Sequence, residues 1–151
     1  TKLSIPEVKE IFDIRVALNG LRDRGIAEDP ERLKLLPMLE AEVAELARLA
    51  RSARHSDDYV KCVFRLNRAL TAASKSARLR AILDALAQQT LRYSQLGLAS
   101  ELRRRQSVRH WQELVKAVRE GDGERAQRAA ELRVRASRDE AIKKLRELAE
   151  S

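Results

Sequence analysis

Capping and breaking residues divide the sequence into six segments whose apolar residues recur every three or four positions, the spacing of one helix face. The clearest starts are the Ser4–Glu7 capping box and Ser76, and the clearest break is the glycine-containing stretch 121–123. We therefore expect helices over residues 4–27, 30–53, 58–73, 76–97, 100–120 and 122–149, with Pro37 kinking or restarting the second.

Composition favours the same fold class. Of 151 residues, 36% are charged, only 3% are aromatic, and glycine and proline number five and three. This usage is typical of long helices rather than of sheets. Because short turns join the predicted helices, they fold most economically as an all-α antiparallel bundle.

Three of the predicted helices have inward faces that include polar residues. The face of the first is Val8, Ile11, Phe12, Arg15, Leu18 and Leu21. The face of the third is Val60, Val63, Phe64, Asn67 and Leu70. On the last helix, Arg133 lies among small alanines. A charge in a core needs a partner or a wet cavity.

These polar interruptions allow two interpretations. Arg15, Asn67 and Arg133, together with Thr90, Tyr93 and Trp111, could converge on one polar pocket inside the bundle, where bundles place ligand sites. Alternatively, the two arginines extend to water along the edges of their faces and Asn67 bonds a neighbouring backbone group.

The net charge of +8 suggests a polyanionic partner, but the cations are poorly clustered. The one tight triplet is 103–105, no aromatic residues alternate with it, and most other cations alternate with acids, as on a solvated surface. Direct nucleic-acid binding therefore stays an alternative. A helical adaptor is another, since a second apolar face on the last helix could bind a partner helix or form a dimer: Leu132, Ala136, Ile142 and Leu145.

Catalytic patterns are absent from the sequence. It holds no glycine-rich phosphate loop and no Ser/His/Asp or Cys/His set in a plausible arrangement, and Asp57 and Asp58 beside His55 are typical of a helix cap. We predict that the protein is not an enzyme. One cysteine, Cys62, and the absence of an export or membrane-spanning segment indicate the cytoplasm.

Three stretches resemble the FCD domain, the C-terminal effector domain of FadR-type regulators in the GntR family. LSIPEVKEIFDIRVALNGLRDRGIA, residues 3–27, is similar to the family's opening helix. LNRALTAASKSARL, residues 66–79, and HWQELVKAVREGDGERA, residues 110–126, resemble two later motifs in the same order and spacing.

This resemblance implies a bundle of six or seven helices, over residues 1–151, that binds a small effector and forms a homodimer. It also implies a winged helix-turn-helix DNA-binding domain that precedes this chain. The start at Thr1, with Met38 as the only methionine, fits a piece of a longer protein.

Most FCD domains hold a divalent metal, and the resemblance carries its ligand positions to Val63, Asn67, Trp111 and Arg133. None of these is a usual zinc or nickel ligand. We therefore expect no metal cofactor and a pocket for a small organic anion. Arg133 and Arg15 would anchor the anion, and Asn67, Tyr93 and Trp111 would orient and enclose it. The alternative is that Trp111 plugs the pocket and the domain only dimerises.

Overall fold

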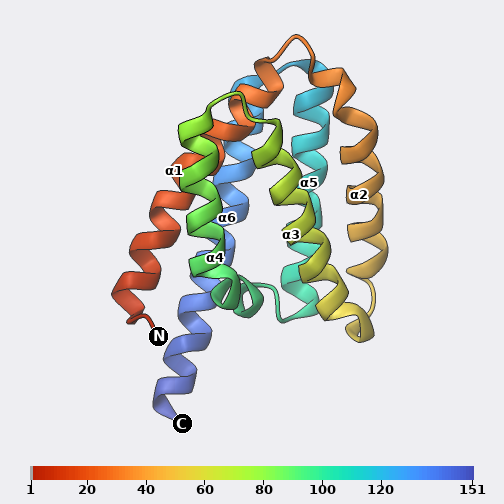
Figure 1. Cartoon of the computed structure of the whole chain (residues 1–151). Coiled ribbons are helices and arrows are strands. Elements are labelled where there is room, and N and C mark those ends of the chain that lie inside the picture. Colours follow the sequence, from red (N-terminus) through yellow and green to blue (C-terminus); the bar gives the residue numbers. More distant parts are fainter. Residues whose placement is uncertain (1) are drawn as a thin grey trace.

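The computed structural model describes residues 2–151, and Figure 1 shows their helices running up and down in one bundle. The α-helices are α1 (Ile5–Glu28), α2 (Leu36–Leu49), α3 (Ser56–Ala73), α4 (Ala77–Gly97), α5 (Glu101–Glu120) and α6 (Gly123–Glu150). Short 3-10 turns span Arg32–Lys34 and Ala53–His55, and residues 2–151 contain no strand. The predicted all-α bundle is confirmed.

Several predicted helix ends are confirmed. Side chains at the starts of α1 and α6 accept hydrogen bonds from free backbone N–H groups, and a glycine ends α5. Ser4 accepts a hydrogen bond from the Glu7 backbone N–H at 3.3 Å, and Glu7 accepts one from the Ser4 N–H at 3.1 Å. Gly121 ends α5 with a φ of 72°, a left-handed conformation that favours glycine. Asp122 then caps α6, so consecutive helices turn back sharply on each other.

The prediction for the second helix was wrong at its start. The chain forms a 3-10 turn at Arg32–Lys34, and α2 begins only at Leu36. Pro37 lies in the first turn of α2, where its missing N–H removes no helical hydrogen bond. Proline therefore restarts the helix instead of kinking it.

The inward face of α1 also differs from the prediction. Leu21 is 55% exposed, whereas Arg22 and Asp23 are buried. The buried positions of α1 are Val8, Phe12, Val16, Asn19, Gly20, Arg22, Asp23, Ile26 and Ala27. In the second half of α1 the buried face includes polar residues. A prediction based on the spacing of apolar residues therefore assigns the wrong residues to the interior.

Two apolar clusters hold the bundle together. The larger joins α2, α3 and α5 around Leu39, Leu66 and Trp111, and the smaller joins α1, α4 and α6 around Phe12, Tyr93 and Val134. Helix α1 packs along α6 for much of its length (Figure 1). The polar cavity described below lies where the two clusters meet.

The arginine triplet is not a surface patch. Arg103 and Arg104 are 6% and 2% exposed. Arg103 donates to the Gly97 carbonyl, and Arg104 donates to the carbonyls of Leu98 and Ala99 just beyond the end of α4. Cations stabilise a helix C-terminus by binding its free carbonyl groups. Arg103 and Arg104 therefore stabilise the end of α4 and are not available at the surface.

The second apolar face of α6 is not free either. Ile142 is buried and Leu145 packs against the smaller cluster, while Leu132 is exposed. These residues therefore do not form one exposed stripe. Among the described residues, no helix combines the length and apolar character needed to cross a membrane.

Candidate functional site

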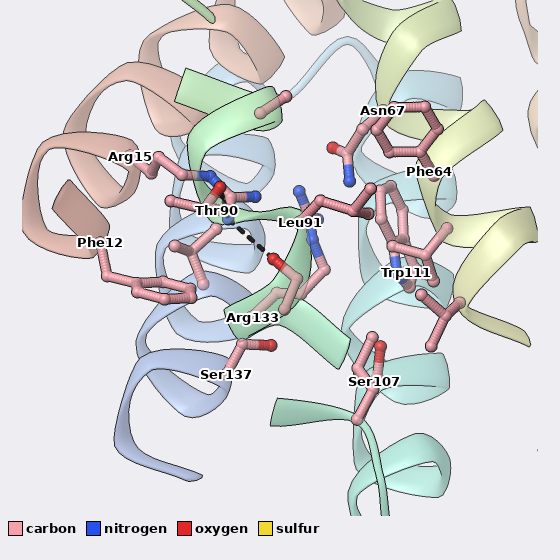
Figure 2. Close-up of a pocket in the computed structure, with 16 residues that line it drawn as sticks. Phe12, Arg15, Phe64, Asn67, Thr90, Leu91, Ser107, Trp111, Arg133 and Ser137 are labelled. Carbon is pink, nitrogen blue, oxygen red and sulfur yellow. Dashed lines mark hydrogen bonds between the residues drawn. The ribbon is translucent and has the colours of Figure 1, made fainter. Parts of the chain in front are cut away.

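A polar cavity lies inside the bundle, with walls from α1, α3, α4, α5 and α6. Its volume of about 60 Å³ has room for roughly four to six waters or a small organic molecule. Its polar lining includes Arg15, Asn67, Thr90, Ser94, Ser107, Trp111, Arg133 and Ser137. Figure 2 labels all of these side chains except Ser94 and shows them converging from different helices.

Four of the five predicted effector residues line this cavity: Arg15, Asn67, Trp111 and Arg133. Tyr93 does not. It is buried in the smaller apolar cluster, and its hydroxyl accepts a hydrogen bond from the Leu3 backbone N–H at 3.0 Å. Tyr93 therefore fastens the chain ahead of α1 to α4.

Arg133 stacks on Trp111. Its guanidinium carbon lies 3.7 Å from the centroid of the Trp111 ring, within the range of a cation–π interaction. The two side chains are 5% and 0% exposed. Arg133 Nη1 and Trp111 Nε1 are nevertheless buried without a hydrogen-bond partner among the described residues. Two donors at the cavity thus lack an acceptor.

Arg133 is only weakly balanced by a carboxylate. Its Nη2 lies 3.5 Å from Asp23 Oδ2, at the long limit of a hydrogen bond. Asp23 is held more closely by Arg22, whose Nε donates to Oδ1 at 2.8 Å. Burial, offset in part by Asp23, lowers the pKa of Arg133 to about 10. Arg133 therefore remains charged at neutral pH.

Arg22 and Asp23 contact cavity residues and were missed by sequence reasoning. Both are buried, although neither belongs to the inward face that was predicted for this helix. Their only available signal was the spacing Val8–Phe12–Val16–Asn19–Asp23, which repeats every three or four residues but becomes polar halfway.

Arg15 reaches the cavity from the opposite side and makes only neutral contacts there. Its Nη1 donates to Thr90 Oγ1 and to Ser94 Oγ, each at 3.2 Å. No ion pair between Arg15 and a carboxylate occurs within residues 2–151. Burial, followed by the positive charges of Arg133 and Arg22, lowers the pKa of Arg15 to about 10. Figure 2 shows Arg15 and Arg133 pointing toward each other from α1 and α6.

Asn67 is oriented by Arg22. Arg22 Nη2 donates to Asn67 Oδ1 at 3.0 Å, while Arg22 Nη1 donates to Thr71 Oγ1 at 3.1 Å. Because the amide oxygen is occupied, the amide NH₂ of Asn67 is left for the cavity, as Figure 2 shows. Asn67 therefore adds another donor to the cavity lining.

The charges around the cavity do not balance. Three guanidinium groups, those of Arg15, Arg22 and Arg133, lie around the cavity. Arg22 and Arg133 share one carboxylate, Asp23, and Arg15 contacts none. Two positive charges are left without a counterion from the described part of the chain. Arg133 is buried, whereas Arg15 is partly exposed. Because uncompensated charge in an interior is costly, an anion in the cavity would relieve it, most of all at Arg133.

The cavity reaches the surface between α3 and α4. Val60 and Phe64 of α3 and Leu91 of α4 line both the cavity and a wider surface groove of about 540 Å³. Phe64 is partly buried and Leu91 is 37% exposed. This apolar mouth separates the charged interior from solvent.

The residues at the expected metal positions do not fit a metal. Val63, Asn67, Trp111 and Arg133 all line the cavity, so the four positions do come together. A valine, an indole and a guanidinium offer no lone pair that binds zinc or nickel, and Arg133 would repel a cation. Within residues 2–151, no three His, Cys, Asp or Glu residues are placed to hold a metal ion.

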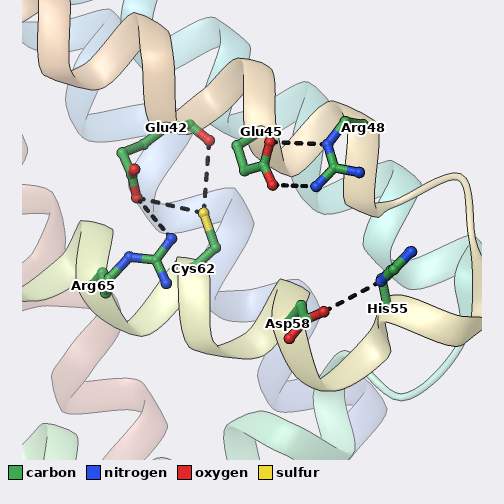
Figure 3. Close-up of polar contacts among 7 residues, drawn as sticks. All are labelled: Glu42, Glu45, Arg48, His55, Asp58, Cys62 and Arg65. Carbon is green, nitrogen blue, oxygen red and sulfur yellow. Dashed lines mark hydrogen bonds and ion pairs between the residues drawn. The ribbon is translucent and has the colours of Figure 1, made fainter.

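The remaining chemistry-bearing residues lie around α2 and the start of α3 (Figure 3). His55 Nδ1 lies 3.2 Å from Asp58 Oδ2, and both side chains are exposed. Cys62 is buried and its Sγ lies 3.5 Å from Glu42 Oε2. Burial and the charge of Glu42 raise the pKa of the Cys62 thiol to about 12, which keeps it protonated and unreactive.

The comparisons with known proteins give one match. Residues 10–136 match the family model of the FCD domain. Neither a curated protein nor a solved structure matches the chain significantly. The match runs from within α1 to the middle of α6 and includes every residue that lines the cavity except Ser137. The chain therefore belongs to the FCD domain family, the effector-binding domains of GntR-type transcription regulators.

Proposed function

We propose that this domain binds a small organic anion, a carboxylate, in the bundle cavity without a metal, and that binding regulates a DNA-binding domain of a cytoplasmic FadR-type regulator. The observation that carries the proposal is the pair of buried, unpartnered donors, Arg133 Nη1 and Trp111 Nε1. A carboxylate offers only acceptors, and a guanidinium binds it directly with two parallel N–H groups.

The other cavity groups support an anion over a neutral ligand. Arg15, Arg133 and the NH₂ of Asn67 are donors without acceptor capacity. Arg133 occupies one of the positions where metal-containing relatives carry a ligand. A fixed positive charge there would take over the role that a metal has in holding a carboxylate.

Regulation would act through the helices that the anion joins. Arg15 is on α1 and Arg133 is on α6, so an anion held by both would fix how these two long helices pack. We propose a homodimer in which this change favours one of two arrangements and so sets the spacing of the DNA-binding domains.

Calorimetric titration of this chain with acetate, propionate, malonate and succinate, each with a chelator present, tests the proposal. The comparison is between Arg133→Met and Arg135→Met, because Arg135 is an exposed arginine on the same helix. We expect Arg133→Met to weaken binding by about 10- to 100-fold, the cost of one charge-assisted hydrogen bond or more. Arg135→Met should bind as the unaltered protein does.

Arg133→Met should remain folded, because Asp23 keeps its closer partner Arg22. Arg133→Lys, which keeps the charge and loses the planar fork, should bind with intermediate affinity. Equal affinity of Arg133→Met and the unaltered protein would refute the anchor role. No binding of any anion by the unaltered protein would favour a domain that is plugged by Trp111 and serves only dimerisation.

A further inference from the structure

The anion site has an excess of two positive charges, and this excess constrains the ligand beyond the class of carboxylates. Arg22 and Asp23 form a close pair, at 2.8 Å, that is neutral as a unit. Arg133 then has only the long 3.5 Å contact to the same carboxylate, and Arg15 has neutral hydroxyl partners. A singly charged ligand would leave one of the two uncompensated.

We propose that the ligand is a short dicarboxylate, of two to four carbon atoms, held between Arg15 and Arg133. This inference rests on the proposed anion site and specifies its charge and size. The two guanidinium groups come from α1 and α6 and point toward each other across the cavity (Figure 2). A dianion between them neutralises both, whereas two separate monoanions would also repel each other.

Size supports the same ligand class. The cavity of about 60 Å³ has room for roughly four to six waters, comparable to the six to eight heavy atoms of a short diacid. A long acyl chain would have to extend out of the cavity into the surface groove. Phe64 and Leu91 at the mouth are apolar. The polar groups of a longer ligand would lose their water there without gaining hydrogen bonds, which is costly.

The remaining donors match carboxylate oxygens. Trp111 Nε1 and Arg133 Nη1 are fully buried and unpartnered, and the Asn67 amide leaves its NH₂ for the cavity. The hydroxyl of Thr90 donates to the Leu86 carbonyl at 2.8 Å and accepts from Arg15, so it is already committed. The cavity thus offers several donors spread along its wall, which suits two carboxylates better than one compact anion.

The test is calorimetric titration with carbon-matched pairs of acids at one ionic strength: oxalate and acetate, malonate and propionate, succinate and butyrate. Sulfate and inorganic phosphate are titrated as compact dianions. We expect at least one diacid to bind about 10- to 100-fold more tightly than its matched monoacid, the effect of one additional charge-assisted contact. We also expect it to bind more tightly than sulfate or phosphate.

The variants separate the two anchors. Arg15→Met should reduce the affinity for the diacid to near that of its monoacid and change monoacid binding much less. Arg133→Met should weaken both. Arg92→Met, which removes an exposed arginine from α4, should change neither.

Three outcomes would overturn the inference. Equal affinity for a diacid and its matched monoacid, with binding lost in Arg133→Met, would refute the dianion and leave the proposed anion site intact. Tighter binding of sulfate or phosphate than of every diacid would refute the dicarboxylate. No binding of any anion would overturn both the inference and the proposed function.

Discussion

At the scale of single residues, Asp23 is the central charge of the cavity. It is fully buried and contacts both Arg22 and Arg133. We predict that Asp23→Asn lowers the free energy of unfolding by about 3–5 kcal/mol, because it leaves buried guanidinium groups without a carboxylate. Chemical denaturation measures this loss.

The matched control for Asp23 is Asp139→Asn. Asp139 pairs with Arg138 on the surface and is 67% exposed. Exposed ion pairs contribute little, so the stability of this variant should be nearly unchanged. If the two variants lose equal stability, Asp23 is not the counterion of a charged interior.

Trp111 makes a second residue-scale prediction. Trp111→Phe keeps an aromatic ring against Arg133 and removes the unpartnered indole N–H. We expect the affinity for the anion to fall about tenfold, the effect of one hydrogen bond to a charged acceptor. Calorimetry is the suitable readout, because the variant has no tryptophan fluorescence. Unchanged affinity would mean that Trp111 only lines the cavity and does not donate a hydrogen bond to the anion.

His110 does not line the cavity, but its pKa responds to the charge of Arg133. Burial lowers the pKa of His110, and the positive charges of Arg133 and Arg103 lower it further. An anion beside Arg133 offsets that charge, so binding should raise the pKa of His110. By linkage, the affinity for the anion should increase as the pH falls below the ordinary histidine value of 6.5, until His110 of the free protein is protonated as well. NMR titration with and without ligand measures the shift, and a fall in the pKa would contradict it.

At the scale of helices, α4 and α6 approach closely at Gly97, and α4 also carries Thr90 and Ser94, the hydrogen-bond partners of Arg15. A Cβ on Gly97 would lie 2.7 Å from the Ser137 carbonyl oxygen. Because that atom belongs to the backbone, Gly97→Ala has to separate the two helices. We predict a loss of about 1–3 kcal/mol in the free energy of unfolding.

Gly123→Ala provides the comparison. A Cβ there would lie 2.6 Å from the Glu28 side chain, which is 51% exposed and can move aside. This variant should keep its stability or gain some, since alanine favours a helix over glycine by about 1 kcal/mol. Equal losses in the two variants would mean that close helix approach at Gly97 is not required.

Sequence patterns predicted the helices well, because caps and breaks are local. Ser4, Ser76 and Asp122 each accept the backbone hydrogen bond expected of a cap. The start of α2 was missed because the chain first makes a 3-10 turn, a choice that depends on packing. Helix propensity alone does not decide such boundaries.

The inward faces were harder to predict, since the interior is polar where the cavity lies. On α3 the predicted face, including Val63 and Asn67, lines the cavity, whereas Tyr59, Cys62 and Leu66 pack in the core. On α1 the buried pair Arg22 and Asp23 was invisible to apolar periodicity. Arg15, Asn67, Trp111 and Arg133 were found because they interrupt apolar faces or occupy the family's metal positions, while Tyr93 was misplaced.

At the scale of the whole molecule, the net charge is +8, but some of the cations that produce it are buried rather than at the surface. Arg22, Arg103, Arg104 and Arg133 are all buried. We predict that this chain alone binds duplex DNA weakly, because two of the three arginines at 103–105 do not face solvent. Electrophoretic mobility at low salt checks this, and tight binding with a steep salt dependence would restore the nucleic-acid interpretation.

The most direct test of metal-free anion binding is thermal unfolding of this chain with malonate, with nickel or zinc, and with a chelator. A ligand at about 100 times its dissociation constant adds roughly 2.7 kcal/mol, a shift of several degrees for a domain of this size. We predict that malonate raises the unfolding temperature equally with and without chelator, and that neither metal alone does. Stabilisation by metal, or loss of the malonate effect with chelator, would contradict the account.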